Sequence, residues 1–135
     1  MPQTLLGFDF GRLRIGVAVG NTVTCTAEAL AIVDAEPLAQ RWKAIAALVE
    51  QWRPDVLVVG RPAVCPAGSD NVRETAARCE RFARQLSGRF RLPVELVDES
   101  GSSLEAEAVL AARGRRGADD AEAAAIILRQ YLSHC

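Results

Sequence analysis

Histidine is nearly absent from this chain of 135 residues: it has one, His134, beside the C-terminal residue. Catalysis by histidine and histidine-rich metal sites are therefore nearly excluded, and a cysteine–histidine nucleophile is poorly supported. The four cysteines, Cys25, Cys65, Cys79 and Cys135, form no C-x-x-C pair. Their spacing predicts neither a zinc site nor a disulfide framework.

Long apolar runs are absent as well. No apolar stretch reaches the roughly 20 residues of a membrane span, and the N-terminus lacks the basic start and cleavage site of a signal peptide. We therefore expect a cytoplasmic protein that makes no membrane contact. The chain is 50% hydrophobic, in short runs broken by glycine, proline and charge, which is typical of a soluble α/β protein. Its length predicts a single domain, residues 1–135, with a buried core.

Aromatic residues make up 5% of the chain, which disfavours single-strand binding by base stacking. Lysine is almost missing too, because Lys43 is the one lysine among 16 basic residues. Arginine suits planar, bidentate contact with phosphate, although a GC-rich genome would produce the same bias. The net charge of −1 by itself indicates no partner, and the sequence does not indicate an oligomeric state.

The apolar pattern predicts three strands followed by alternating helices and strands. Leu5–Phe10 and Ile15–Val19 are typical of buried strands, and a turn at Gly20-Asn21 leads into a third strand over 24–33. Short links indicate that these three strands pair antiparallel. The later elements are a helix from Pro37 to Arg53, a strand over 56–59, a helix over 71–87, a strand over 94–97, a helix from a Ser102/Glu105 capping box to Gly114, and an apolar helix after the loop 114–120. The prediction is an α/β fold around a mixed sheet.

One carboxylate lies in an otherwise apolar stretch, Asp9 in "LLGFDFGRLRIGVAVG". An unpaired carboxylate is costly to bury, so Asp9 needs a partner, a proton, a turn to cap or a metal ion. Other acids occupy special places: Asp98 and Glu99 end the last strand, and Asp119 and Asp120 open the final helix. Carboxylates suit Mg²⁺ or Mn²⁺, and two such ions about 3.5–4 Å apart support phosphodiester cleavage.

Each acid also has a structural interpretation. Asp119 with Glu122 makes a helix N-cap pair, and Asp120 in the first turn is favoured by the helix dipole. Asp98 fits a solvated strand end, and Glu99 a cap or an arginine partner. Asp9 could accept backbone N–H groups from the turn at Gly11. Spacing alone leaves the metal site and these roles open.

Four segments together resemble the YqgF/RuvX family of Holliday-junction-resolvase-like nucleases. They are "LLGFDFGRLRIGVAVGN", "VLVVGRPA", "LPVELVDESGSSLEAEA" and "DDAEAAAIILRQYL". The resemblance runs in order over nearly the whole chain. It implies a ribonuclease H-like fold with a five-stranded sheet, three antiparallel strands then parallel strands, flanked by helices. It also implies a metal-dependent nuclease linked to 5′-end maturation of the 16S rRNA precursor, with resolution of DNA junctions as the older proposal.

Carried over by position, the family's three acids fall on Asp9, Glu99 and Asp120, which leaves Asp119 as the helix cap. If the last strand is not next to the first, strands about 4.8 Å apart place Glu99 about 10 Å across the sheet from Asp9. Three motifs depart from the family. The basic pair common after the first glycine appears here as Leu13-Arg14, with an extra arginine at position 12. "DES" replaces the usual "DER", so an arginine is missing, and "GRPAVCPAG" replaces a loop with Asn and Asp while adding Arg61.

The leading hypothesis is a Mg²⁺- or Mn²⁺-dependent nuclease acting on structured RNA or branched DNA, with Arg12, Arg14 and Arg61 contacting phosphates. An arginine-rich face on the 71–87 helix extends this surface or is simply a solvated face balanced by acids; its members are Arg73, Arg78, Arg81 and Arg84, with Glu74 and Glu80.

Two other functions stay open. A nucleotide-binding role of the actin-like kind fits the Gly-x4-Gly spacing, but the Lys-Ser/Thr of a P-loop is missing after Gly16, and the chain is too short for two domains. The second is a ribosome-assembly factor that binds nucleic acid and has little catalytic activity, which the altered loop and the missing arginine favour.

Overall fold

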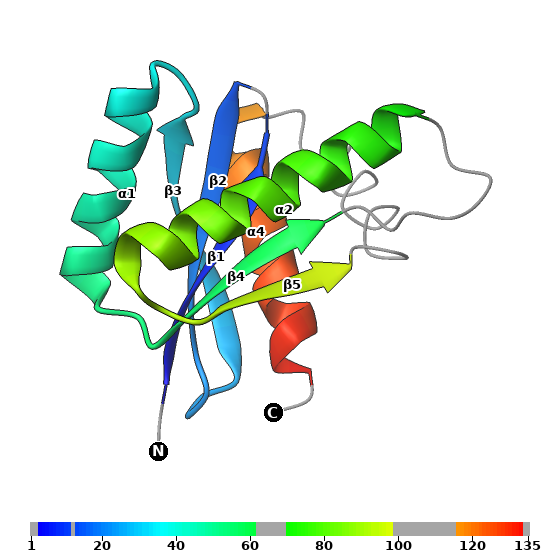
Figure 1. Ribbon diagram of the computed structural model, residues 1–135. Helices are drawn as coiled ribbons and strands as arrows, with labels where there is room; N and C mark the ends of the chain where they lie inside the picture. The colour runs from blue at the N-terminus through cyan, green and yellow to red at the C-terminus, as the bar shows by residue number, and fades with distance from the viewer. Residues whose placement is uncertain (1–2, 12, 62–69, 99–115, 134–135) are drawn as a thin grey trace.

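The computed structural model describes residues 3–11, 13–61, 70–98 and 116–133. Five strands form one sheet in the order β3-β2-β1-β4-β5 (Figure 1). The first three strands pair antiparallel, and β4 and β5 run parallel to β1. The predicted mixed sheet is thus confirmed. The elements are β1 (Thr4–Phe10), β2 (Arg14–Asn21), β3 (Thr26–Asp34), α1 (Leu38–Trp52), β4 (Val56–Arg61), α2 (Asp70–Phe90), β5 (Val94–Asp98) and α4 (Arg116–Leu132).

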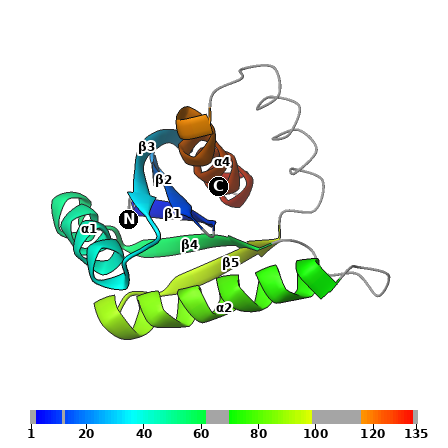
Figure 2. The same cartoon turned by 90° about the horizontal axis from the view of Figure 1, so that it is seen from above.

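Helices cover both faces of the sheet (Figure 2). Leu6, Phe8 and Val59 point to the face under α1 and α2, where they pack with Phe82 and Leu86 of α2. The intervening residues point the other way, because side chains alternate along a strand. Leu5, Val58 and Ala18 pack with Ala124 and Leu128 of α4. No helix in the described ranges has the length and apolar character needed to cross a membrane.

The turn after β2 differs from the prediction. β2 continues through Asn21, and residues 22–25 make the turn. The Asn21 side chain accepts a hydrogen bond from the Val23 amide at 2.6 Å, so this asparagine begins the turn and does not occupy its centre. Cys25 lies in the same turn, and Cys79 of α2 is free and buried.

The start of α4 also differs from the prediction. This helix begins at Arg116, so Asp119 lies inside its first turn and is not the N-cap. The predicted Asp119–Glu122 capping pair is therefore wrong. Aspartate is favoured both at the cap and in the first turn of a helix, so residue type could not separate the two positions. The helix predicted from Ser102 to Gly114 lies outside the described residues.

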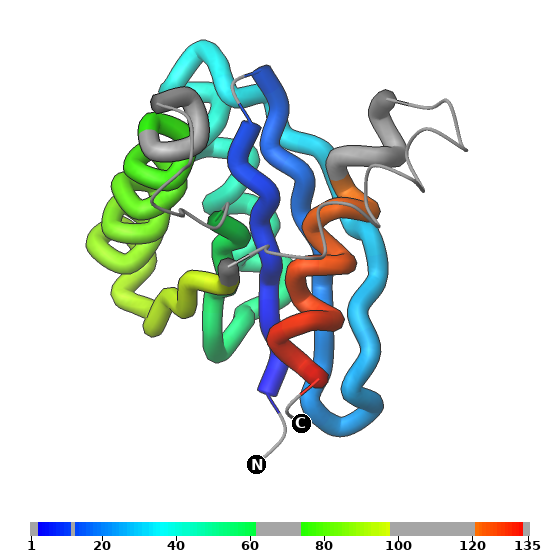
Figure 3. Tube along the Cα trace, turned by 90° about the vertical axis from the view of Figure 1, so that its right-hand side faces the viewer, coloured from blue at the N-terminus to red at the C-terminus, as the bar shows by residue number. Residues whose placement is uncertain are grey.

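Small residues let α4 lie close against the sheet. A Cβ atom at Gly7 would collide with the Leu128 side chain, and one at Gly20 would come within 3.2 Å of Leu132 and of the Thr26 carbonyl. Because Gly20 pairs with Leu5 near the start of β1, α4 runs antiparallel to β1. The N-terminal end of α4 therefore points toward the carboxyl end of β1, as Figure 3 shows.

The close contact at Gly7 predicts a specific sensitivity. Gly7→Ala should destabilise the fold by about 1–3 kcal/mol, because the added methyl group overpacks the contact with Leu128. Gly88→Ala is the matched control, since a Cβ there meets nothing within 4 Å. It should stabilise α2 by about 0.5–1 kcal/mol. Urea unfolding of both variants measures the difference, and equal stability would contradict the close packing of α4.

Candidate functional site

Asp9 lies near the carboxyl end of β1 and is half-buried. It follows Leu5 and Gly7 at two-residue steps, so it shares their face of the sheet, the face covered by α4. Its cross-strand partner in β2 is Gly16, which has no side chain. On the other side, Phe8 pairs with Val59 of β4, and the next residue of β4 is Gly60. Its neighbours on both adjacent strands are therefore glycines, which place no side chain directly beside this carboxylate.

The sheet topology places the carboxyl ends of β4 and β5 at the same edge of the sheet as Asp9. β1, β4 and β5 are parallel, so their carboxyl ends lie at one edge of the sheet. Glu99 comes directly after β5 in the sequence but lies outside the described residues. Asp120 belongs to the first turns of α4, in the part of the helix whose side chains are not described. β4 separates β1 from β5, in agreement with the expected spacing of about 10 Å between the first and last strands.

The metal ligands stay a prediction. Of the three acids, Asp9 is the one whose side chain falls within the described part of the chain. Within that part, no three acidic, cysteine or histidine side chains gather closely enough to hold a metal ion. What the fold supplies is a half-buried carboxylate flanked by glycines, at the edge of the sheet where β5 also ends.

Arg14 shares the surface of Asp9. It is the first residue of β2, and it precedes Gly16 by two residues, so both point to the face covered by α4. Since Asp9 pairs with Gly16, Arg14 is its diagonal neighbour across the two strands, a separation that long side chains can span. The predicted phosphate contact by Arg14 therefore agrees with its position.

Arg61 lies on the opposite face. It is the last residue of β4, and its Nη1 atom donates to Glu80 Oε1 of α2 at 2.7 Å. The structure therefore separates Arg61 from Asp9 by the thickness of the sheet, although both residues end neighbouring strands. Arg12, the third arginine predicted to contact nucleic acid, lies outside the described residues.

A buried arginine was missed in the sequence. Arg41 of α1 is 8% exposed, its Nε atom donates to the Ala35 carbonyl at 2.8 Å, and its guanidinium carbon lies 5.1 Å from the Phe10 ring centroid. Burial lowers the pKa of Arg41, and nearby Glu36 raises it to a smaller extent. A signal was present, because Arg41 is spaced four residues from Ile45 on the apolar stripe of α1.

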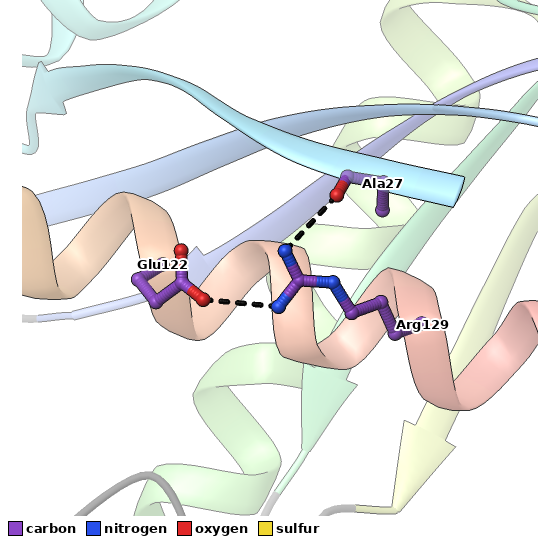
Figure 4. Close-up of polar contacts among 3 residues, drawn as sticks. All are labelled: Ala27, Glu122 and Arg129. Atoms are coloured by element: carbon purple, nitrogen blue, oxygen red, sulfur yellow. Dashed lines mark hydrogen bonds and ion pairs between the residues drawn. The ribbon is translucent and has the colours of Figure 1, made fainter. Parts of the chain in front are cut away.

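Arg129 fastens α4 to the edge of the sheet (Figure 4). Its Nη1 atom donates to Glu122 Oε1 at 2.9 Å, and its Nη2 atom donates to the Ala27 carbonyl of β3 at 3.1 Å. The Glu122 side chain is 17% exposed, which strengthens this ion pair relative to a fully solvated one. One guanidinium thus links two turns of α4 to the start of β3 and fixes the helix that carries Asp120.

A family model described as "RuvX: Holliday junction resolvase" matches residues 3–134 of the chain. The chain belongs to the RuvX family. A protein of Bordetella avium (strain 197N) named "Putative pre-16S rRNA nuclease" is 53% identical over 133 residues, covering 98% of this chain and 97% of the relative. A protein of Burkholderia mallei (strain SAVP1) with the same name is 54% identical over 131 residues, covering 96% and 87%. The family resemblance read from the sequence is confirmed.

Solved structures support the fold of this RuvX family member. Thermus thermophilus RuvC in complex with a Holliday junction substrate superposes with a TM-score of 0.60 at 20% identity, covering 97% of this chain and 94% of RuvC. A second T. thermophilus RuvC structure gives a TM-score of 0.50 at 18% identity, with 97% and 95% coverage. The predicted ribonuclease H-like fold is thus confirmed.

The Arg129 contacts predict that this side chain stabilises the packing of α4 on the sheet. Arg129→Met keeps the aliphatic stem but removes both donors, and it should cost about 1 kcal/mol of unfolding free energy. Arg84→Met, on the exposed side of α2, should change stability by less than about 0.5 kcal/mol. Hydrogen exchange should show the loss of protection concentrated in α4. Uniform loss throughout the sheet would contradict an anchoring role.

Proposed function

We propose that this protein is a nuclease dependent on Mg²⁺ or Mn²⁺, that it hydrolyses phosphodiester bonds, and that its substrate is the 16S rRNA precursor. The observation that carries the proposal is Asp9, a half-buried carboxylate on the α4 face of β1 with Gly16 as its cross-strand neighbour, in a chain of the RuvX family. The substrate follows from relatives named "Putative pre-16S rRNA nuclease", which are 49–54% identical over nearly the whole chain.

Helical spacing supports Asp120 over Asp119 as the second ligand. Asp120 precedes Ala124 by four residues, and Ala124 is buried against the sheet. Asp119 precedes Ala123 by four residues, and Ala123 is half-buried. Residues four apart share a helix face, so the Asp120 position belongs to the stripe that faces the sheet. Because α4 runs antiparallel to β1, this stripe leads toward Asp9.

Strand alternation supports Glu99 as the third ligand. Val97 of β5 packs with the core cluster beneath α4, which also contains Val58 and Leu128. A residue two positions beyond Val97 has the same facing in an extended strand. In the sequence, Glu99 is two positions beyond Val97 and Asp98 is one position beyond it. Strand alternation therefore favours Glu99 over Asp98 as the third ligand.

The residues present fit a divalent-ion site, because hard carboxylate oxygens are the ligands that Mg²⁺ and Mn²⁺ prefer. Bound ions of this kind supply an activated water and stabilise the charge on the leaving oxygen. Asp9, Glu99 and Asp120 hold the ions, and Arg14 orients the substrate phosphate from the neighbouring strand. Contacts of this type bind the phosphate backbone without reading base sequence.

The Asp9 carboxylate should be essential for cleavage. Asp9→Asn keeps the size of the side chain but removes its charge, and it should lower the cleavage rate by on the order of 100-fold or more. Asp55→Asn is the control, because Asp55 lies at the opposite end of the sheet, where its Oδ2 atom accepts a hydrogen bond from the Thr4 amide. This variant should cleave the substrate at the wild-type rate.

The measurement uses end-labelled 5′-extended 16S rRNA precursor, a four-way DNA junction and a plain duplex, each with Mg²⁺, Mn²⁺ or EDTA. Junction cleavage without precursor cleavage would replace the RNA substrate by branched DNA. A thermal-melting series adds a readout independent of turnover, since Mn²⁺ should raise the melting temperature of wild type but not of Asp9→Asn. Folded wild-type protein that cuts no substrate would contradict the nuclease and favour the assembly factor.

A second prediction separates neighbouring acids. Asp120→Asn and Glu99→Gln should lose cleavage to the same order as Asp9→Asn, whereas Asp119→Asn and Asp98→Asn should stay within about threefold of wild type. The pairs are matched in sequence position and in the charge removed. The same cleavage assay and the Mn²⁺-dependent melting shift measure both. Loss of function at Asp119 with none at Asp120 would overturn the assigned facing of α4.

A further inference from the structure

A cavity with an arginine-rich wall lies between α1 and α2, on the face of the sheet opposite Asp9. Its volume is about 310 Å³. Figure 2 shows both helices on this side of the sheet. The cavity is lined by Phe10, Glu36, Leu38, Arg41, Arg78, Arg81 and Gln85. Phe10 is the last residue of β1 and directly follows Asp9, so the cavity adjoins the same edge of the sheet.

Arg41 forms the fixed part of this wall. Its Nε atom is held by the Ala35 carbonyl, and its guanidinium group lies over the Phe10 ring. Nη1 and Nη2 have no hydrogen-bond acceptor among the described residues, and neither is a solvent-shielded atom. Arg41 lines the cavity, and with its Nε atom bonded the side chain needs little further ordering to bind an anion.

Two arginines of α2 complete the positive wall. Arg78 and Arg81 are three residues apart, so they project from neighbouring positions on one side of the helix. Arg78 also pairs with Glu74 at 2.9 Å. Among the described residues that line the cavity, Glu36 is the one carboxylate, against three guanidinium groups. The cavity therefore carries a net positive charge suited to an anion.

The start of α1 adds to this preference. Leu38, its first residue, lines the cavity, and Pro37 at the N-cap makes no side-chain capping bond. The first turn of α1 has no acidic residue, and Glu36, which precedes the N-cap, is the nearest carboxylate to it in the sequence. Guanidinium groups and a helix N-terminus both favour oxyanions with several acceptor oxygens, phosphate above all.

We propose that Arg41, Arg78 and Arg81 bind a backbone phosphate of the nucleic acid, outside the cleavage centre. This inference rests on the proposed function. Asp9 and Phe10 are consecutive residues at the carboxyl end of β1 and face opposite sides of the sheet. A nucleic-acid strand bound at Asp9 therefore reaches the cavity by passing over that end of the sheet. The arginine-rich face recognised in the sequence is thereby divided: Arg78 and Arg81 serve this cavity, while Arg84 lines a different one beside β5.

The test compares two arginines on the same helix. Arg81→Gln removes a charge from the cavity, and Arg84→Gln removes one from the neighbouring surface. Both positions are exposed, so both variants should fold. Binding of the RNA precursor and of the four-way junction is measured in EDTA, without cleavage. Arg81→Gln should weaken binding about tenfold and reduce the salt slope of log K by about 1, whereas Arg84→Gln should change neither. Arg81→Lys, which keeps the charge, should restore most of the slope.

A second arm uses inorganic phosphate alone. The Arg41 Nε–Hε group is hydrogen-bonded, so its NMR signal reports on the cavity. Phosphate should shift this signal in wild type and less in Arg81→Gln. If phosphate shifts the signal but both glutamine variants bind nucleic acid equally, the site takes free phosphate and the proposal is wrong. If neither arm responds, no anion site exists. The binding arm needs no turnover, so a wild type that fails to cut but shows the Arg81 effect would refute the nuclease and leave this site standing.

Discussion

The close packing of α4 on the sheet is the constraint on which the candidate site depends. Gly7 and Gly20 provide the space, because a Cβ at either position would press against Leu128 or Leu132. Helix and sheet consequently approach with little side-chain volume between them, and Arg129 fastens the edge of the contact. The direction of α4 relative to β1 is set by these contacts. Packing therefore directs the N-terminal end of α4 toward the carboxyl end of β1. The proposed site depends on this direction, because Asp120 lies near the start of α4 and Asp9 near the end of β1.

Strand alternation divides the chemistry of the sheet edge between two faces. Asp9 and Phe10 are neighbours in the sequence, yet one belongs to the α4 side and the other to the cavity under α1 and α2. The same alternation separates Arg14 from Arg61, which both lie at this edge. In the proposed binding mode, nucleic acid contacts Asp9 and Arg14 on one side of the sheet and the Arg41 cavity on the other. The sheet edge is the element that both surfaces share.

Apolar periodicity predicted the elements well where the signal came from burial. The predicted ends of β1, β4 and α1 lie within two or three residues of the observed ones, because the apolar runs of these elements are buried. Pro37 and Arg53 also mark the two ends of α1. Boundaries set by polar side chains were less predictable. Asparagine and aspartate suit several positions in a turn or at the start of a helix. Asn21 and Asp119 therefore occupy other positions than the predicted ones. The ribonuclease H-like identity came from the family resemblance, because periodicity alone gave only a mixed α/β sheet.

The candidate site was predictable to the extent that it depends on single positions. Asp9 was recognisable as a charge in an apolar strand, whereas the facing of Arg61 depends on its register and on Glu80, which is 19 residues away. The burial of Arg41 could be inferred from its place on the apolar stripe of α1, but its contacts with Ala35 and Phe10 depend on the fold. Burying a guanidinium group has a desolvation cost, and an apolar side chain of similar volume would fill such a position at least as stably. A buried arginine that lines a cavity together with Arg78 and Arg81 is therefore better explained by binding than by packing.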